Sequence, residues 1–244
     1  PQDRSSAASD VYKRQSLIID AQTGLELHSR NANTKKFPAS LTKIMTLYMI
    51  FDALENKKWS LRKRLKVSRR ASRQPQTRLG LKRGSTITVK TAILALITRS
   101  ANDVATVVAE NMSGSEIKFA RQMTRKARKL GMVRTTFRNA SGLPNRRQLS
   151  TARDMAKLAI AIRTDFPQYY HFFKTKKFRY RGRTYRNHNM LLGRYSGTDG
   201  VKTGYTNASG YNLVASVKRR GKHLIGIVFG LSLIHISEPT RPLD

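Results

Sequence analysis

The sequence of 244 residues contains no cysteine, and no apolar run reaches the roughly 18 residues of a membrane-spanning helix. The missing cysteine excludes disulfide bonds, thiolate zinc sites and cysteine nucleophiles. Low-complexity segments and internal repeats are absent as well. With 39% hydrophobic residues, the composition indicates a folded globular core rather than a disordered chain.

Acidic residues are scarce: 14 Asp and Glu stand against 48 Lys and Arg, a formal net charge of +34. Such a balance favours polyanionic partners, including nucleic acid, an anionic membrane or anionic envelope polymers. The basic residues are scattered, with only short runs such as 218–220, which is typical of a solvated basic surface. No nucleic-acid motif is present, so we expect no specific nucleic acid partner, and any such binding would be salt-sensitive and non-specific.

The two ends differ from the rest of the sequence. Residues 1–15 (PQDRSSAASDVYKRQ) and 231–244, ending in SLIHISEPTRPLD, resemble translated sequencing-adapter read-through. We expect both to be non-native or disordered tails around a single domain at 16–230; genuine flexible termini are the alternative. On this interpretation a signal peptide and a C-terminal extension are missing from the sequence.

Strand patterns occur at both ends of this domain and helix patterns between them. A hairpin is predicted at 16–29, and alternating or apolar strands follow in DGVKTGYT, NLVASVKRR and KHLIGIVFG. Helical periodicity predicts helices from residue 40, at 90–98, 101–112, 115–130 and 151–163, the first with one buried face. The expected fold is α/β (α+β): an antiparallel sheet built from both ends of the chain, flanked by helices, with an inserted helical region.

The first short motif, Ser40-Leu41-Thr42-Lys43, is predicted at the start of a helix. Residues three apart share a helix face, so Lys43 can present its amine to the Ser40 hydroxyl. A serine is a poor nucleophile until a base takes its proton, and a buried lysine kept neutral by neighbouring cations can be that base. Taken alone, the motif is better explained by a helix-capping serine with an exposed lysine.

Two further motifs follow along the chain. Ser100-Ala101-Asn102 lies between two apolar helices, where Ser100 could relay a proton and Asn102 could bind a substrate carbonyl while holding Lys43; helix capping is the alternative. Lys202-Thr203-Gly204 lies on a predicted strand whose edge can align an extended peptide. There Lys202 and Thr203 could bind a substrate carboxylate and Gly204 allow close approach, unless the strand is merely exposed and basic.

All three motifs in this order are typical of penicillin-binding proteins and class A β-lactamases, although the middle one has Ala where Asp is common. With the phrases PASLTKIMT, RSANDVA, NASGLP and DGVKTGYTNASGYNLVAS, residues 16–230 closely resemble the low-molecular-mass penicillin-binding proteins. These are D-alanyl-D-alanine carboxypeptidases of serine peptidase family S11, with a β-lactamase/transpeptidase-like fold. The motifs are specific to the penicillin-recognising superfamily, and the surrounding phrases narrow the resemblance to this family.

The resemblance implies a periplasmic or secreted cell-envelope enzyme that removes the terminal D-alanine from peptidoglycan stem peptides through an acyl-enzyme. It implies no cofactor and no metal, and β-lactam antibiotics would acylate the nucleophile as substrate mimics. The implied catalytic residues are Ser40 (nucleophile), Lys43 (general base) and Ser100; the implied substrate-binding residues are Asn102, Lys202, Thr203, Gly204, Tyr205 and Thr206. Backbone N–H groups of Ser40 and Tyr205 would form the oxyanion hole.

The sequence departs from the family after its last strand. Family members continue with a carboxylate-binding arginine and a closing helix, where this chain has SLIHISEPTRPLD, so no role is transferred to Arg241. A β-lactamase would need a second base, usually a glutamate, and 139–150 contain no carboxylate. A peptidoglycan D,D-endopeptidase with the same site, or a basic polyanion-binding module, are the alternatives; His188 and Asp199 are interpreted as a loop and a turn residue.

Overall fold

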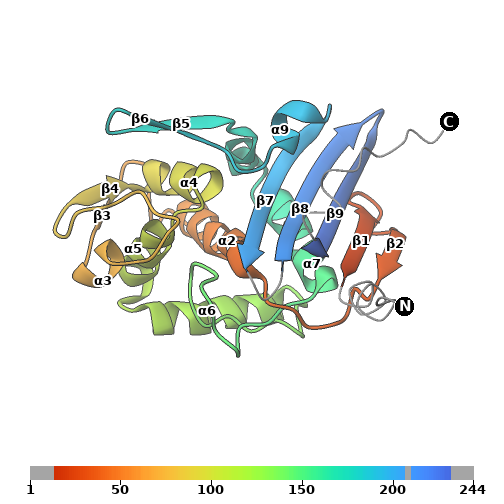
Figure 1. Ribbon diagram of the computed structural model, residues 1–244, viewed down its shortest axis with the longest axis horizontal. Coiled ribbons are helices and arrows are strands. Elements are labelled where there is room, and N and C mark those ends of the chain that lie inside the picture. Colours follow the sequence, from red (N-terminus) through yellow and green to blue (C-terminus); the bar gives the residue numbers. More distant parts are fainter. Residues whose placement is uncertain (1–13, 207–209, 232–244) are drawn as a thin grey trace, which may run out of the picture.

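The computed structural model describes residues 14–206 and 210–231 (Figure 1). Within these ranges a five-stranded antiparallel sheet has the order β2-β1-β9-β8-β7, which confirms a sheet built from both ends of the chain. Its strands are β1 (Gln15–Asp20), β2 (Glu26–Arg30), β7 (Thr198–Thr206), β8 (Gly210–Arg219) and β9 (Lys222–Leu231). The sheet includes Gln15 and Leu231, one residue beyond each expected domain end, whereas 1–13 and 232–244 lie outside the described residues.

Successive side chains of a strand point to opposite faces of the sheet, so every second residue of these strands faces the helices. Leu17, Val214, Ile225, Ile227 and Phe229 are buried on this face, and Leu17 lies opposite Ile227 in the β1–β9 ladder. Helix α7 (Ala152–Asp165) lies against this side of the sheet, behind it in Figure 1. The tight β8–β9 turn has positive φ at Arg220 (49°) and Gly221 (74°), as a two-residue hairpin of this twist requires.

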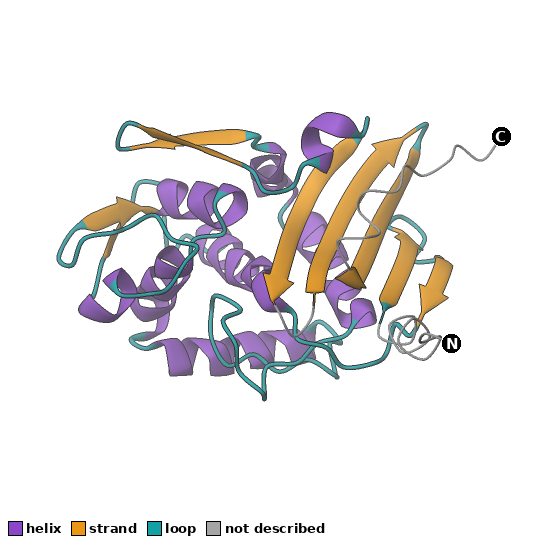
Figure 2. Cartoon of the chain, viewed as in Figure 1, coloured by secondary structure: helices purple, strands orange, loops and turns teal. Residues whose placement is uncertain are grey.

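In sequence the helices lie between β2 and β7, and in Figure 2 most of them gather beside the β7 edge of the five-stranded sheet. The helical segments are η1 (Ala39–Leu41), α2 (Thr42–Glu55), α3 (Arg69–Ser72), α4 (Val89–Thr98), α5 (Asn102–Ser113), α6 (Glu116–Lys129), α7, α8 (Pro167–Tyr170), η2 (His171–Lys174) and α9 (Leu191–Arg194). Two separate strand pairs lie outside the main sheet: β3 (Arg64–Lys66) with β4 (Thr86–Thr88), and β5 (Lys177–Tyr180) with β6 (Arg183–Arg186). In the described part of the chain, no helix combines the length and apolar character that a bilayer crossing requires.

Helix α2 differs from the prediction because it is buried on all sides rather than on one face. Met45, Thr46 and Met49 are buried together with the residues of the predicted stripe. The helix contacts α4, α5, α6 and α7, so neighbours surround it. A helix enclosed in this way no longer shows a one-sided apolar pattern. This central, rigid helix carries Lys43 in its first turn.

The helices expected to begin at 115 and 151 are capped by the residues at these positions. The Ser115 hydroxyl accepts a hydrogen bond from the Lys118 backbone N–H, and Gly131 adopts φ 72° after the end of α6. At the start of α7, Thr151 caps the Asp154 N–H, but the Asp154 carboxylate does not return the bond to Thr151. It instead accepts from the Arg134 N–H and the Thr135 hydroxyl, and so ties α7 to the segment that follows α6.

The loop between α3 and β4 is held against α5 by one buried carboxylate. Asp103 accepts hydrogen bonds from the backbone N–H groups of Leu79, Gly80 and Leu81 at 3.0–3.1 Å. The Asp103 side chain is fully buried, and these donors replace the water that a carboxylate needs. This loop therefore forms a fixed wall beside the first turn of α5, where Asn102 lies.

Candidate active site

Ser40 lies in the 3₁₀ turn η1 that leads into α2, half-buried between two glycines. A Cβ on Gly204 of β7 would lie 3.1 Å from the Ser40 backbone nitrogen. A Cβ on Gly142 would lie 1.8 Å from the Ala39 carbonyl oxygen and 2.9 Å from the same nitrogen. Gly142 thus approaches the Ser40 peptide unit more closely than any side chain would allow, and Gly204 leaves only a tight fit for one.

Substituting Gly142 by alanine is expected to disturb this turn. The new Cβ collides with backbone, and φ at 87° is strained for any L-residue, so we expect a loss of about 3 kcal/mol in the free energy of unfolding. Covalent labelling by penicillin should slow by roughly 100-fold, because the nucleophile is displaced. Gly182→Ala is the matched control: its φ is 77° and its Cβ would meet open space, so it should cost about 1 kcal/mol and leave labelling unchanged. Equal effects of the two variants would contradict a role for the close approach.

The Lys43 amine is fully buried and has three partners. Its nitrogen lies 3.2 Å from the Ser40 Oγ, 2.9 Å from the Asn102 Oδ1 and 2.5 Å from the Ser141 carbonyl oxygen. Asn102 Oδ1 and the Ser141 carbonyl only accept hydrogen bonds, so they engage two N–H groups. In a neutral amine, the remaining lone pair then faces the Ser40 hydroxyl, which is the arrangement a general base requires.

The electrostatics of the site favour a neutral Lys43. Burial, followed by the positive charge of Lys202, lowers the pKa of Lys43 well below that of an exposed lysine, and nearby Asp103 opposes this effect. Burial also lowers the pKa of Lys202 to about 7. Two buried cations next to one another repel, so removal of one proton from the pair is favourable. Lys43 and Lys202 are both buried. This excludes the two alternative interpretations in which Lys43 is an exposed residue beside a helix cap and Lys202 lies on an exposed basic strand.

Asn102 is oriented by the loop between α3 and β4. Its amide nitrogen donates to the carbonyl oxygens of Pro75 (3.2 Å) and Gln76 (3.0 Å), which directs its Oδ1 toward Lys43. Both amide hydrogens are therefore engaged within the protein. The structure places Asn102 as a holder of Lys43, and its contact with substrate stays a prediction.

The Ser100 hydroxyl is buried and makes no hydrogen bond within the described residues. Its backbone has φ 57°, and its carbonyl accepts from the Thr77 hydroxyl, so the residue is fixed by the same loop that holds Asn102. A buried hydroxyl without a partner is costly and uncommon in folded proteins. The position leaves this group free for a substrate or a water molecule; its role as proton relay stays a prediction.

Strand β7 carries the third motif along the site. Lys202 is 2% exposed and donates to the Thr203 carbonyl at 2.9 Å. Gly204 contacts the Ser40 turn as described above, and the exposed Tyr205 ring makes a tilted contact with the Tyr211 ring. The Thr206 side chain lies outside the described residues. The structure thus brings β7, Ser40 and Lys43 together, whereas the roles in carboxylate and oxyanion binding stay predictions.

Sequence reasoning missed three residues around the site: Ser141, Gly142 and Glu116. The Ser141 carbonyl and Gly142 belong to NASGLP, which contributed only to the family resemblance. Glu116 is distant from that segment in sequence but accepts from the Ala140 N–H at 3.2 Å and pairs with Arg70 at 2.8 Å. His188 lies in the loop after β6, as interpreted from the sequence, and its pKa is lowered to about 4, first by partial burial and then by the charges of Lys202, Arg99 and Lys43.

Known proteins of one family resemble this chain over most of its length. The sequence profile of peptidase family S11, described as D-alanyl-D-alanine carboxypeptidase, matches residues 2–232. The chain belongs to this family. S11 relatives include D-alanyl-D-alanine carboxypeptidases DacF of Bacillus subtilis (35% identical over 224 residues, 90% of this chain) and DacC of Escherichia coli (37% over 230 residues, 91%). The chain spans 57% and 58% of these two proteins, which are therefore longer.

Solved structures of S11-type proteins share the fold. Penicillin-binding protein 5 of Haemophilus influenzae superposes with a TM-score of 0.85 at 31% identity, covering 88% of this chain and 64% of that one. Penicillin-binding protein D2 of Listeria monocytogenes, in its ampicillin-bound form, gives 0.80 at 30% identity, with 88% of each chain covered. The predicted fold class, with its β-lactamase/transpeptidase-like arrangement, is thus confirmed.

Proposed function

We propose that this chain is the catalytic part of a serine D-alanyl-D-alanine carboxypeptidase that removes the terminal D-alanine from peptidoglycan stem peptides. The observation that carries the proposal is the buried Lys43 amine, which is held by Asn102 and Ser141 and directed at the Ser40 hydroxyl. A neutral amine next to a serine hydroxyl can act as the general base that activates this nucleophile. Membership of family S11 supports the same reaction.

In the acylation step, the Ser40 Oγ attacks the carbonyl carbon of the penultimate D-alanine while its proton passes to Lys43. Backbone N–H groups of Ser40 and Tyr205 stabilise the oxyanion. The C–N bond then breaks, and the departing D-alanine amine takes a proton that Lys43 supplies through the buried Ser100 hydroxyl. Water next attacks the ester carbon and gives one proton to Lys43. The bond between that carbon and the Ser40 Oγ then breaks, Lys43 returns the proton to the Ser40 oxygen, and the shortened peptide leaves as a carboxylic acid.

Substrate selection in this proposal depends on the terminal carboxylate. Lys202 lies on the strand that packs against the nucleophile turn, and burial lowers its pKa to about 7, which disfavours its positive charge. A bound carboxylate would stabilise that charge, so acidic substrates gain binding energy that amides and esters do not. Thr203 and Thr206 would supply hydroxyl donors to the same carboxylate.

The test compares two reactions of the same protein. One is the release of free D-alanine from a synthetic pentapeptide, and the other is the cleavage of a fragment in which two stem peptides are cross-linked. A relative from Pseudomonas aeruginosa, 30% identical over 236 residues, is named a D-alanyl-D-alanine endopeptidase, so cross-link cleavage is the second candidate function. We expect D-alanine release that penicillin blocks. Preferential cleavage of the cross-link would establish the endopeptidase, and turnover of neither substrate by folded protein would refute both.

β-Lactams are proposed as inhibitors of the same site. The Listeria monocytogenes relative has been solved in ampicillin-bound and cefotaxime-bound forms, and this chain shares its fold. A β-lactam carbonyl would acylate Ser40 in place of the peptide. The carboxylate of Glu116 is occupied by Arg70 and the Ala140 N–H, so it is not free to activate water for rapid β-lactam turnover. Slow, stoichiometric acylation is the expected outcome.

We also propose residence at the anionic cell envelope, where the substrate is located. The outward face of α6 carries exposed basic side chains without an exposed acid among them: Lys118, Arg121, Arg125, Arg128 and Lys129. Such a face suits an anionic envelope polymer. Binding to isolated envelopes should weaken steeply between low and physiological salt. Retention that is indifferent to salt would contradict this proposal.

A further inference from the structure

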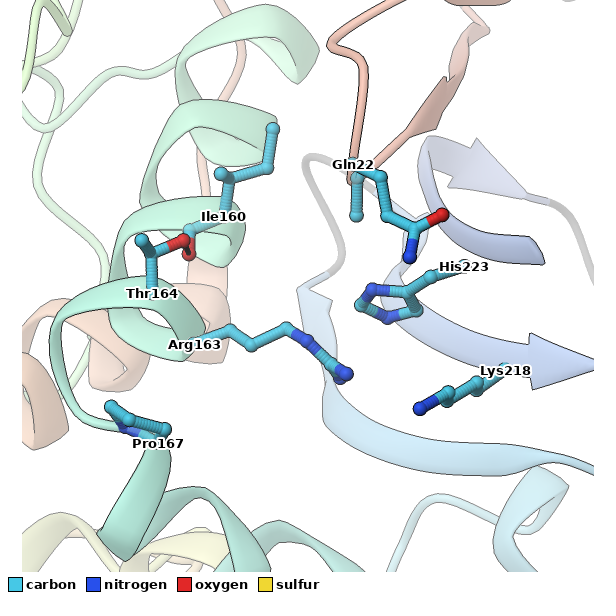
Figure 3. A pocket seen from close by; sticks show the side chains of 8 residues that line it. Gln22, Ile160, Arg163, Thr164, Pro167, Lys218 and His223 are labelled. Carbon is cyan, nitrogen blue, oxygen red and sulfur yellow. Dashed lines mark hydrogen bonds between the residues drawn. The ribbon is translucent and has the colours of Figure 1, made fainter. Parts of the chain in front are cut away.

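A second concave site lies away from Ser40, between the end of α7, the β1–β2 turn and the β8–β9 hairpin (Figure 3). The cavity has a volume of about 270 Å³ and none of its lining residues is acidic. Its polar side chains come from three segments: Arg163 and Thr164, Gln22, and Lys218 with His223. Figure 3 shows Arg163 extending from α7 across the cavity toward His223 and Lys218. Three nitrogen-bearing groups thus converge on one small space.

The Arg163 guanidinium is fixed by an ion pair and by a contact with an aromatic ring. One of its terminal nitrogens donates to the Asp199 carboxylate at 2.9 Å, and its plane lies 5.0 Å from the Tyr170 ring centre. Asp199 is 7% exposed and lies on β7, so it is a buried ion-pair partner and not the turn residue that the sequence suggested. A guanidinium has five N–H donors, and the single bond to Asp199 leaves others directed away from that carboxylate.

His223 is fixed in the same manner. It is 3% exposed, and its Nε2 is hydrogen-bonded to the buried Ser216 hydroxyl at 2.7 Å, which leaves its other ring nitrogen without a hydrogen bond among the described residues. Burial, then the charge of Arg163, and to a smaller extent that of Lys218, lower the pKa of His223, while Asp199 and Asp20 act in the opposite direction. An anion in the cavity would offset the charges of Arg163 and Lys218 and would favour the protonated form of His223.

From this geometry we infer that the cavity binds a phosphate group, as a free ion or at the end of a small phosphate ester. Donors from separate segments suit the several oxygens of a tetrahedral anion, and prealigned Arg and His groups favour binding because little ordering is needed. The volume is below the roughly 300–1,000 Å³ of drug-sized pockets, so the ligand is small. Ile160 and Pro167 provide an apolar wall for a short carbon chain. This site is independent of the acyl-transfer chemistry at Ser40.

The test is calorimetric titration of the protein with inorganic phosphate at low ionic strength, comparing Lys218→Glu with Lys222→Glu. Both residues are exposed lysines on the β8–β9 hairpin, and Lys222 does not line the cavity, so the two variants change the net charge equally. We expect one saturable site that weakens by about 10-fold or more in Lys218→Glu and less than about 2-fold in Lys222→Glu. Arg163→Lys, which keeps the ion pair with Asp199 but loses the planar fork, should also weaken binding at unchanged Tm.

Two further titrations distinguish the sources of the phosphate. Glycerol phosphate that binds with the same variant pattern identifies a soluble ester, and phosphatidylglycerol vesicles that do so identify a lipid headgroup. Equal weakening in Lys218→Glu and Lys222→Glu, or no saturable phosphate binding by wild type, would overturn the inference. Penicillin labelling of Ser40 is expected to be unchanged in every variant, so failure of this site is separable from failure of the proposed function.

Discussion

Ser40→Ala is expected to abolish covalent labelling by a fluorescent penicillin and to reduce D-alanine release by roughly 10,000-fold or more. The reason is structural: the Ser40 Oγ is the atom that the Lys43 amine faces at 3.2 Å, and no other group replaces it once the hydroxyl is removed. The substitution removes one atom from a half-buried turn and one weak hydrogen bond, so the fold should be retained. Intact mass spectrometry after incubation with penicillin measures the effect as the presence or absence of one adduct.

The control for this experiment is Ser16→Ala, a partly buried serine on β1 whose hydroxyl bonds to His28. It should label like wild type, and circular dichroism should show the same fold for all three proteins. Ser100 is the competing nucleophile, because its hydroxyl is buried without a partner in the described structure. An adduct that persists in Ser40→Ala and maps to Ser100 would show that the nucleophile has been misassigned.

Local sequence patterns predicted the parts of this protein that depend on neighbouring residues. The i, i+3 spacing of Ser40 and Lys43 predicted their contact, and the capping residues Ser115 and Thr151 predicted the starts of two helices. Alternating and apolar patterns predicted the strands β8 and β9. These features follow from backbone geometry over a few residues, where the sequence carries the whole signal.

The remaining features depend on segments far apart in sequence. The Ser141 carbonyl reaches Lys43 across 98 residues, and nothing around Ser141 identifies it as an acceptor. Gly142 and Gly204 have little or no room for a side chain because the backbone of the Ser40 turn packs against them. No local sequence pattern reveals this contact. Likewise, the buried pairing of Asp199 with Arg163 depends on α7 meeting β7, so the sequence suggested only a turn. Family resemblance therefore named the candidate site residues. The structure was needed to show which groups hold the Lys43 amine next to Ser40.

Lys43→Met is expected to slow acylation by penicillin by roughly 1,000-fold or more, because a general base typically contributes about 100- to 10,000-fold. Methionine has a similar length and suits a fully buried position, but it cannot accept the Ser40 proton. Lys43→Arg should be equally slow, since a guanidinium keeps its charge and is never neutral in proteins. Stopped-flow labelling measures the rates, and Lys90→Met, at an exposed lysine of α4, serves as the unaffected control.

The pH profile separates a base from a residue that only positions Ser40. The neutral amine is the reactive form, and its fraction rises with pH through the pKa of Lys43, so wild-type acylation should rise with pH in this way. Because burial and Lys202 lower that pKa, the rise should lie well below the range of an exposed lysine. Both lysines titrate as a coupled pair, so the midpoint belongs to the pair. The residual rate of Lys43→Met should lose this rise; if the rise persists with the same midpoint, the base is another group and Lys43 only orients the nucleophile.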